Sequence, residues 1–213
     1  MVLQQKEEIL FWGNSEPNSK ITIDGSWGES STTNSNDKGV WSLKLKTPGA
    51  GGPFDVLISS EIKGFIKKEE KIIYKDILIG EVWLASGQSN MEWRLNQCDD
   101  CIDNQEEEIK NANYNDIRMF NVPQDLWGDA IKRQKWEITT SENVEDFSAT
   151  AYFFARKLNK ELKIPIGIIN SSWGGTRVEA WTSMKKLKSL NSTKEKKDVI
   201  ESDNQLSKKM SKK

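Results

Sequence analysis

A serine with the surroundings of a nucleophile follows a strongly apolar run. Residues 77–85 are rich in β-branched and aromatic side chains, which is typical of a strand covered on both faces of a parallel sheet. Gly87 ends the run, and Ser89 stands in a short polar turn before a segment that suits a helix. Backbone N–H groups are free at a helix N-terminus and can hold an oxyanion. The position therefore predicts a nucleophilic serine or, as the alternative, a serine that only caps the helix.

A second turn of this kind follows a second apolar run. Residues 164–169 indicate another buried strand, and Gly174 and Gly175 lie just past its end. Ligands of open α/β sheets bind outside the carboxyl ends of the strands, so both turns occupy positions where sites form. Between the turns, apolar residues recur at helical spacing and predict a crossover helix on the sheet: Phe147, Ala151, Phe154, Ala155, Leu158 and Leu162.

The chain contains no histidine, so it has no imidazole to take a proton from a serine hydroxyl. Such a hydroxyl is a weak nucleophile at neutral pH, and loss of one member of a catalytic triad lowers the rate roughly ten-thousandfold. A lysine base, for example Lys185 or Lys186, is an alternative. These lysines lie in a charged run, where water favours the ammonium form, so they rank last.

Four segments in order resemble a known family. They are GQSNMEW at residues 87–93, FSATAYFFARKLNKEL at 147–162, PIGIINSSWGGTRVEAWTS at 165–183 and the opening MVLQQKEEILFWGNSEPNSKITI at 1–23. Together they are similar to the sialic acid 9-O-acetylesterase family of SGNH-type carbohydrate esterases, over roughly residues 1–185.

The resemblance implies the roles of particular residues. Ser89 would accept the acyl group, and the N–H groups of Ser89 and of the Gly174 and Gly175 turn would contact the oxyanion. Gln88 and Glu179 would support them. No metal or organic cofactor is expected, and the substrate would be an O-acetylated sugar, either a sialic acid or a plant-type acetylated glycan.

Two blocks of the family are not found in these residues. Family members continue to a block resembling WYQGESN and later to an Asp-x-x-His block that carries the catalytic histidine, whereas this chain has neither before Lys213. We therefore expect a serine-type carbohydrate O-acetylesterase that is incomplete or inactive as an isolated chain, with a second polypeptide as a candidate source of the missing blocks. The alternative is a non-catalytic carbohydrate-binding relative. The family suggests a secreted or periplasmic protein, although this chain has no signal peptide.

Tryptophans flank both turns. A flat apolar ring with an N–H group suits stacking on a sugar, and packing in the core is an equal alternative. The three candidates for sugar contact are Trp93, Trp173 and Trp181, and core positions are expected for Trp12, Trp41 and Trp83.

The resemblance implies an α/β fold with a partial flavodoxin-like SGNH hydrolase parallel sheet, preceded by a small antiparallel β-sandwich. Short strands separated by Gly, Asn, Ser and Pro place the sandwich in residues 1–76, either as a structural unit or as a sugar-binding module. Gly39 is expected to supply a positive φ in a hairpin loop. Residues 77–184 form the N-terminal part of the esterase domain, and residues 185–213 form a lysine-rich tail. In this topology, the strand at residues 164–169 would lie at an unpaired edge.

Composition excludes other classes of partner. A formal net charge of -1 gives no reason to expect nucleic acid, and no run of 18 apolar residues indicates a membrane span. Cys98 and Cys101 cannot close a structural zinc site by themselves, because such a site needs four N or S ligands. They are expected to form a short-range disulfide or to remain free thiols.

Overall fold

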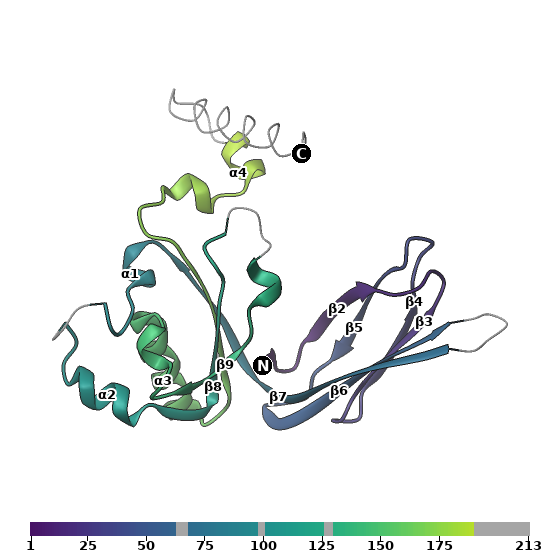
Figure 1. The fold of residues 1–213 in the computed structure, drawn as a ribbon, viewed down its shortest axis with the longest axis horizontal. Helices are drawn as coiled ribbons and strands as arrows, with labels where there is room; N and C mark the ends of the chain where they lie inside the picture. The colour runs from purple at the N-terminus through teal and green to yellow at the C-terminus, as the bar shows by residue number, and fades with distance from the viewer. Residues whose placement is uncertain (63–67, 98–100, 126–129, 190–213) are drawn as a thin grey trace.

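The molecule has two parts that share one long strand. A computed structural model describes residues 1–62, 68–97, 101–125 and 130–189. An antiparallel β part lies beside an α/β part, and β7 (Lys68–Gly87) runs from one into the other (Figure 1). The mixed fold class expected from the sequence is therefore confirmed. Because β7 passes through residues 76 and 77 without a break, the predicted domain boundary falls inside a strand and stays a prediction.

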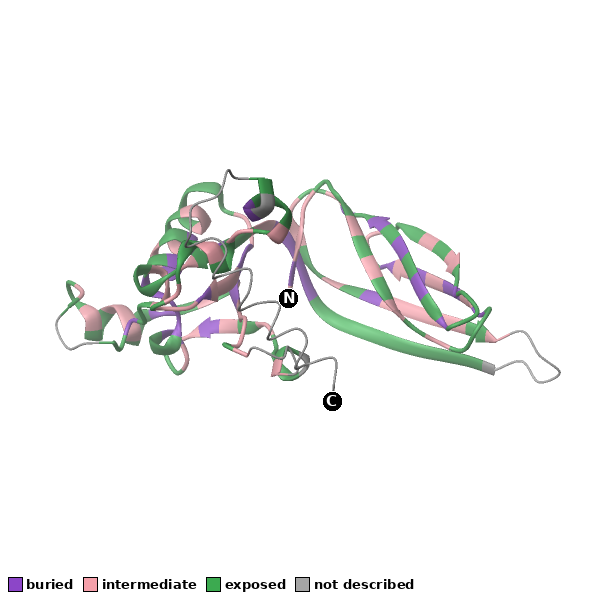
Figure 2. Ribbon diagram, turned by 90° about the horizontal axis from the view of Figure 1, so that it is seen from above, coloured by how far each residue is buried: buried purple, intermediate pink, exposed green. Residues whose placement is uncertain are grey.

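Two sheets form the β part. The smaller pairs β2 (Glu8–Asn14) with β5 (Val40–Lys46), and the larger has the order β4 (Ser30–Asn34), β3 (Lys20–Gly25), β6 (Gly51–Ile62) and β7. Burial alternates residue by residue along β3 and β5, as expected for strands with one face against a core (Figure 2). Both sheets contribute to that core: Ile21, Ile23, Trp41, Leu43, Leu45, Val56 and Ile77.

Gly39 has the positive φ that was predicted, whereas two of the three predicted core tryptophans are exposed. Gly39 has φ +77°, and a Cβ there would lie 2.1 Å from the Ser15 carbonyl oxygen. Trp41 is buried, but Trp12 is 73% exposed because it falls on the outward phase of β2. The core position expected for Trp12 is thus wrong, and Trp83, which is also largely exposed, is a second such case.

The α/β part continues the sheet in the order β7, β10 (Ile166–Ser172), β8 (Asn113–Asn121) and β9 (Glu137–Thr140). β10 is parallel to both β7 and β8, and β9 is antiparallel to β8. The strand predicted at an edge is therefore central, and its expected edge position is wrong. Both β7 and β10 carry continuous apolar runs, so the sequence pattern alone does not say which of them lies inside the sheet.

Helix α3 (Ala149–Leu162) covers one face of this sheet. Its N-cap is Ser148, whose Oγ accepts a hydrogen bond from the Ala151 N–H at 3.2 Å. The helix is confirmed, but Phe154 and Leu162 of the predicted buried stripe are exposed. Tyr152 is buried in their place, and its hydroxyl donates to Glu108 Oε1 at 2.6 Å. Burial and this carboxylate raise the pKa of Tyr152 far above its ordinary value.

An ion pair between a buried arginine and a half-exposed aspartate joins the two parts. Arg118 of β8 donates through both terminal nitrogens to the Asp76 carboxylate of β7, each at 2.8 Å. The guanidinium holds the pKa of Asp76 below its ordinary value, chiefly through these hydrogen bonds. Near this junction, the short strand β1 (Val2–Gln4) pairs with β7 in parallel, from Leu78 to Gly80.

The remaining described elements are short. They are α1 (Ser89–Glu92), α2 (Gln105–Asn111), α4 (Met184–Ser189) and the 3₁₀ turns η1 (Ala130–Arg133), η2 (Val144–Asp146) and η3 (Val178–Trp181). Within the described ranges, each helix is too short or too polar to cross a bilayer. Cys98 and residues 190–213 of the predicted tail lie outside these ranges. Cys101 lies within them and is not a free thiol.

Candidate active site

Ser89 lies at the carboxyl end of β7 and is the first residue of α1. The N-cap position belongs to Gln88, so Ser89 does not occupy the capping position that the sequence left as an alternative. Ser89 is exposed, and its Oγ makes no hydrogen bond to any described residue. Its side chain is therefore accessible, and no described residue accepts a hydrogen bond from its hydroxyl.

The turn after β10 meets the turn after β7. The Trp173 N–H donates to the Gly87 carbonyl at 2.9 Å, which extends the strand pairing into the turns. A Cβ on Gly174 would lie 3.6 Å from Ser89 Cα and 2.4 Å from Glu92 Oε2. Only glycine fits this close approach without moving a neighbour. The two turns predicted from the sequence thus lie together at the carboxyl ends of β7 and β10.

Glu92 is a site residue that the sequence analysis did not single out. Its Oε2 accepts a hydrogen bond from the Gly174 N–H at 2.5 Å, and its Oε1 accepts one from Gln124 Nε2. Gln124 Nε2 also donates to the Ser172 carbonyl at 3.3 Å. The position of Glu92 one helical turn after Ser89 is a signal that could have found it, whereas Gln124 carries no comparable signal.

Gln88, from the turn after β7, also contacts the turn after β10. Its Nε2 donates to the Thr176 carbonyl, which lies just beyond the glycines. Thr176 Oγ1 in turn donates to the Trp173 carbonyl at 2.6 Å and accepts from Trp181 Nε1 at 2.8 Å. The indole N–H of Trp181 is therefore hydrogen-bonded within the protein, and only its ring faces are available to contact another molecule.

Trp93 and Glu179 differ in their relation to Ser89. The Trp93 N–H donates to the Ser89 carbonyl at 2.9 Å, and its exposed indole lies at the end of α1. Glu179 belongs to η3 and makes no hydrogen bond to a described residue of either turn. It lines a separate hollow of about 460 Å³ with residues of η3 and α4. Its supporting role stays a prediction.

A small polar cavity of about 260 Å³ opens beside Glu92. Its walls include Gln124 from the loop after β8 and Asn170 and Ser172 from β10. Asn170 Oδ1 accepts from Ser172 Oγ at 2.9 Å, so the wall is already hydrogen-bonded. The cavity is smaller than the roughly 300–1,000 Å³ usual for small-molecule sites. It could hold part of a substrate.

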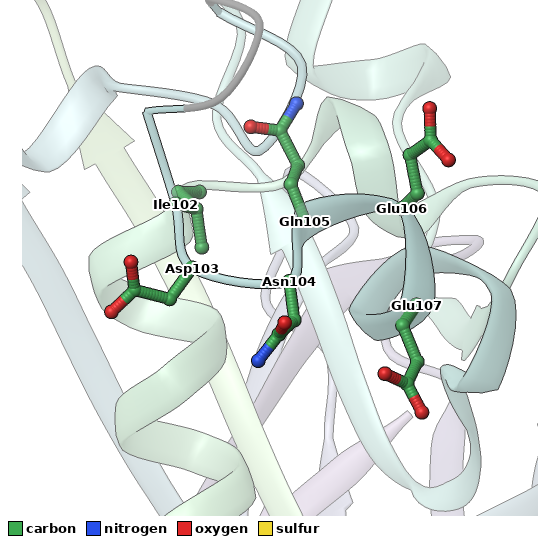
Figure 3. A pocket seen from close by; sticks show the side chains of 6 residues that line it. All are labelled: Ile102, Asp103, Asn104, Gln105, Glu106 and Glu107. Atoms are coloured by element: carbon green, nitrogen blue, oxygen red, sulfur yellow. The ribbon is translucent and has the colours of Figure 1, made fainter.

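Another hollow, at the start of α2, is lined by acidic residues. It measures about 470 Å³, and Figure 3 shows that the carboxylates of Asp103, Glu106 and Glu107 point in different directions. Among the described residues, no group of three or more His, Cys, Asp or Glu side chains is arranged to hold a metal ion.

Comparisons with known proteins identify the family of the chain. A family model for carbohydrate esterases, sialic acid-specific acetylesterase, matches residues 79–204. Sialate O-acetylesterase of Homo sapiens is 33% identical over 205 residues, and the match covers 88% of this chain and 38% of that protein. The Mus musculus protein is 31% identical over 205 residues, with 88% and 37% covered. The crystal structure of a carbohydrate acetylesterase from Xanthomonas citri superposes with a TM-score of 0.75 at 33% identity, covering 88% of this chain and 41% of that one.

The fold and the joined turns define an α/β protein whose candidate site lies at the carboxyl ends of two adjacent parallel strands. Because the family model covers more than half of its residues, the chain belongs to the family of sialic acid-specific carbohydrate esterases. The resemblance carried by residues 87–93 and 165–183 is thereby confirmed. The chain spans about 38% of the length of its human relative.

Proposed function

We propose that this chain carries the nucleophile of a serine carbohydrate O-acetylesterase, with Ser89 as the attacking residue. The observation that carries the proposal is the approach of Gly174 to within 3.6 Å of Ser89 Cα, measured from an added Cβ. An exposed serine beside glycine N–H groups at a helix start is the geometry that acyl transfer needs. The chain has no histidine, so a second polypeptide is proposed to supply the imidazole.

The reaction follows from these groups. An imidazole removes the proton from Ser89 Oγ as the oxygen attacks the acetyl carbonyl, and the N–H groups of Ser89 and Gly174 stabilise the oxyanion. The imidazolium then protonates the departing sugar hydroxyl, and water hydrolyses the acetyl-serine. The Gly174 N–H is now bound to Glu92, so substrate must displace that carboxylate or use the neighbouring Gly175 N–H.

The proposed substrate is an O-acetylated sugar, either a sialic acid or an acetylated plant-type glycan. Trp93 and Trp181 are exposed beside the two turns and can stack on a sugar face, and the half-buried Trp173 is the third candidate. The polar cavity beside Glu92 offers amide and hydroxyl groups to sugar hydroxyls.

Reconstitution tests the proposal. We define the partner segment as the part of human sialate O-acetylesterase that follows the region matched by this chain. Mixing the chain with the partner segment should raise hydrolysis of an O-acetylated sialic acid roughly ten-thousandfold over the chain alone. Ser89→Ala should abolish the gain, whereas Ser141→Ala, in an exposed turn, should retain it. Full activity of the Ser89→Ala mixture would refute Ser89 as the nucleophile.

A non-catalytic carbohydrate-binding role is the second candidate. It is favoured by the unpartnered Ser89 hydroxyl and by the exposed rings of Trp93 and Trp181. In that case, the chain alone would bind an O-acetylated sugar, Trp93→Ala would weaken binding at least tenfold, and Ser89→Ala would not. Calorimetric titration separates this role from the enzymatic one.

A further inference from the structure

The second half of β7 has a partner strand on one side. Over Glu81–Gly87 it pairs with β10. On its other side, β1 ends opposite Gly80, and the Gln4 side chain then accepts a hydrogen bond from the Val82 N–H at 2.8 Å. Beyond Val82, no described strand pairs with this side of β7.

Backbone groups point away from the sheet along this edge. Alternate residues of a parallel strand direct their N–H and C=O groups to opposite neighbours. The Gly87 carbonyl faces β10, where it accepts from Trp173, and the Val82 N–H faces the Gln4 side. By this alternation, the N–H and C=O groups of Leu84 and Ser86 face the open side.

The side chains of the open edge are apolar. Leu84 is 67% exposed and Trp83 is 44% exposed, and successive residues of a strand point to opposite faces of the sheet. Trp83 contacts Phe154 of α3 edge to face, with ring centroids 5.2 Å apart, and Phe154 is itself 41% exposed. Apolar surface is therefore uncovered on both faces of the open edge.

The other unpaired edges of the large sheet look different. Among the described strands, residues 68–77 of β7 pair only with β6, and they include six charged side chains. β4 has the sequence SSTTN and β9 has EITT, so both are short and mostly polar. Natural edge strands resist unwanted pairing through charge, proline or short length. Residues 82–86 have no charge and no proline, and Ser86 is their one polar side chain. They continue the buried segment of β7 at residues 77–80.

We propose that the open edge of β7 at residues 82–86 accepts a parallel β-strand from a second polypeptide that corresponds to the unmatched part of the acetylesterase relatives. The matches cover 88% of this chain but 38% of the human relative and 41% of the Xanthomonas citri chain, so most of each relative lies outside the matched region. A parallel strand continues the pattern of β10 and β8. A second copy related by a two-fold axis would present its edge antiparallel.

This inference deepens the proposed function, because it states where the partner binds. Gly174 follows β10 and approaches Ser89 from that side of β7. The carboxyl end of a parallel strand added on the other side would place its loop at the opposite flank of Ser89. The partner's apolar strand would cover Leu84, and a helix after it would pack beside α3 on Trp83 and Phe154.

Binding of the partner segment to the full chain tests the inference without an activity assay. Native mass spectrometry should show a one-to-one complex, and hydrogen exchange of the Leu84 and Ser86 amides should slow at least tenfold in it. Leu84→Lys, which places a charge on the open edge, should weaken binding at least tenfold. Leu10→Lys is the matched control, because Leu10 is a half-exposed strand residue of the β part.

Each outcome decides between the possibilities. Absence of a complex, or a complex that forms equally well with Leu84→Lys and leaves both amides unprotected, overturns the inference. A Leu84-dependent homodimer of the chain alone overturns it in favour of a second copy. Leu84→Pro, which removes the outward N–H group, should act like Leu84→Lys, and unchanged exchange of the β8 and β10 amides shows that both variants are folded. Edge binding without hydrolysis would leave the inference standing and remove the proposed function.

Discussion

The β part encloses a core between two sheets, whereas the α/β part presents an apolar, unpaired strand edge beside its candidate site. In the β part, two sheets enclose one core, and its outer strand β4 is short and polar. In the α/β part, β7 presents the exposed Leu84 at its open side, and Ser89 follows that same strand. The candidate nucleophile therefore follows the strand whose edge is apolar and unpaired, and not a strand of the β part.

The largest expected effect comes from a substitution at Gly174, on the β10 side of the candidate site. Gly174→Val should lower the activity of the chain mixed with the partner segment by a hundredfold or more, because its side chain would displace Glu92 and crowd Ser89. Loss of one oxyanion donor is usually worth roughly 10²–10³ in rate. The matched control Gly49→Ala should be near normal, since the nearest atom to its added Cβ is at 3.9 Å. Equal rates for both variants would exclude Gly174 from the reaction.

Hydrogen exchange compares the open and covered strands directly. In the chain alone, the amides of Leu84 and Ser86 should exchange about a hundredfold faster than those of Ile166 and Ile168, since β10 is paired on both sides. This reverses the expectation from the sequence, which placed the open edge on residues 164–169. Equal protection of the two strands, measured by NMR, would show that the β7 edge is already covered.

Two glycine substitutions measure how much the free energy of unfolding depends on the loops of the β part. Gly39→Ala should lower the free energy of unfolding by about 2 kcal/mol or more, because φ is +77° and the new Cβ would meet the Ser15 carbonyl. Gly28→Ala shares the positive φ but has no atom within 4 Å of its Cβ, so it should lose about half as much. Urea denaturation gives both values. Identical losses would show that the loop relaxes freely.

The smallest effect concerns the ion pair between the two parts. Because Arg118 lowers the pKa of Asp76 in the folded chain, the pair stabilises the fold above the ordinary pKa of the carboxyl group and loses this effect as pH falls through the folded value. At pH 7, Asp76→Asn should cost about 1 kcal/mol, a modest figure because the carboxylate is half exposed. The difference from wild type should shrink as the pH falls below the ordinary pKa of the carboxyl group and vanish below its lowered folded value. A difference independent of pH would contradict this assignment.

Local patterns in the sequence predict much of the fold. Period-two alternation locates β3 and β5, and continuous apolar runs locate β7 and β10, because each pattern reflects which faces of a strand are buried. Strand order is not local information, which explains the error over β10. The same limit applies to Phe154, since helical spacing alone does not say whether its side chain contacts a covered or an open strand.

The candidate site divides in the same way. Ser89 and Gly174 could be chosen from the sequence because each stands in a turn after an apolar strand. Glu92 and Gln124 could not be paired, since their hydrogen bond joins segments 32 residues apart and depends on how two loops meet.

Covalent labelling of Ser89 tests most directly whether this serine is a nucleophile that needs an outside imidazole. The oxygen of an activated serine attacks the phosphorus of a fluorophosphonate, fluoride leaves, and the base takes the hydroxyl proton. Peptide mapping by mass spectrometry then locates the adduct. The account predicts an adduct on Ser89 when the partner segment is present and at most trace labelling in the chain alone. Rapid labelling of Ser89 in the chain alone, or an active mixture in which the adduct lies on another residue, would contradict it.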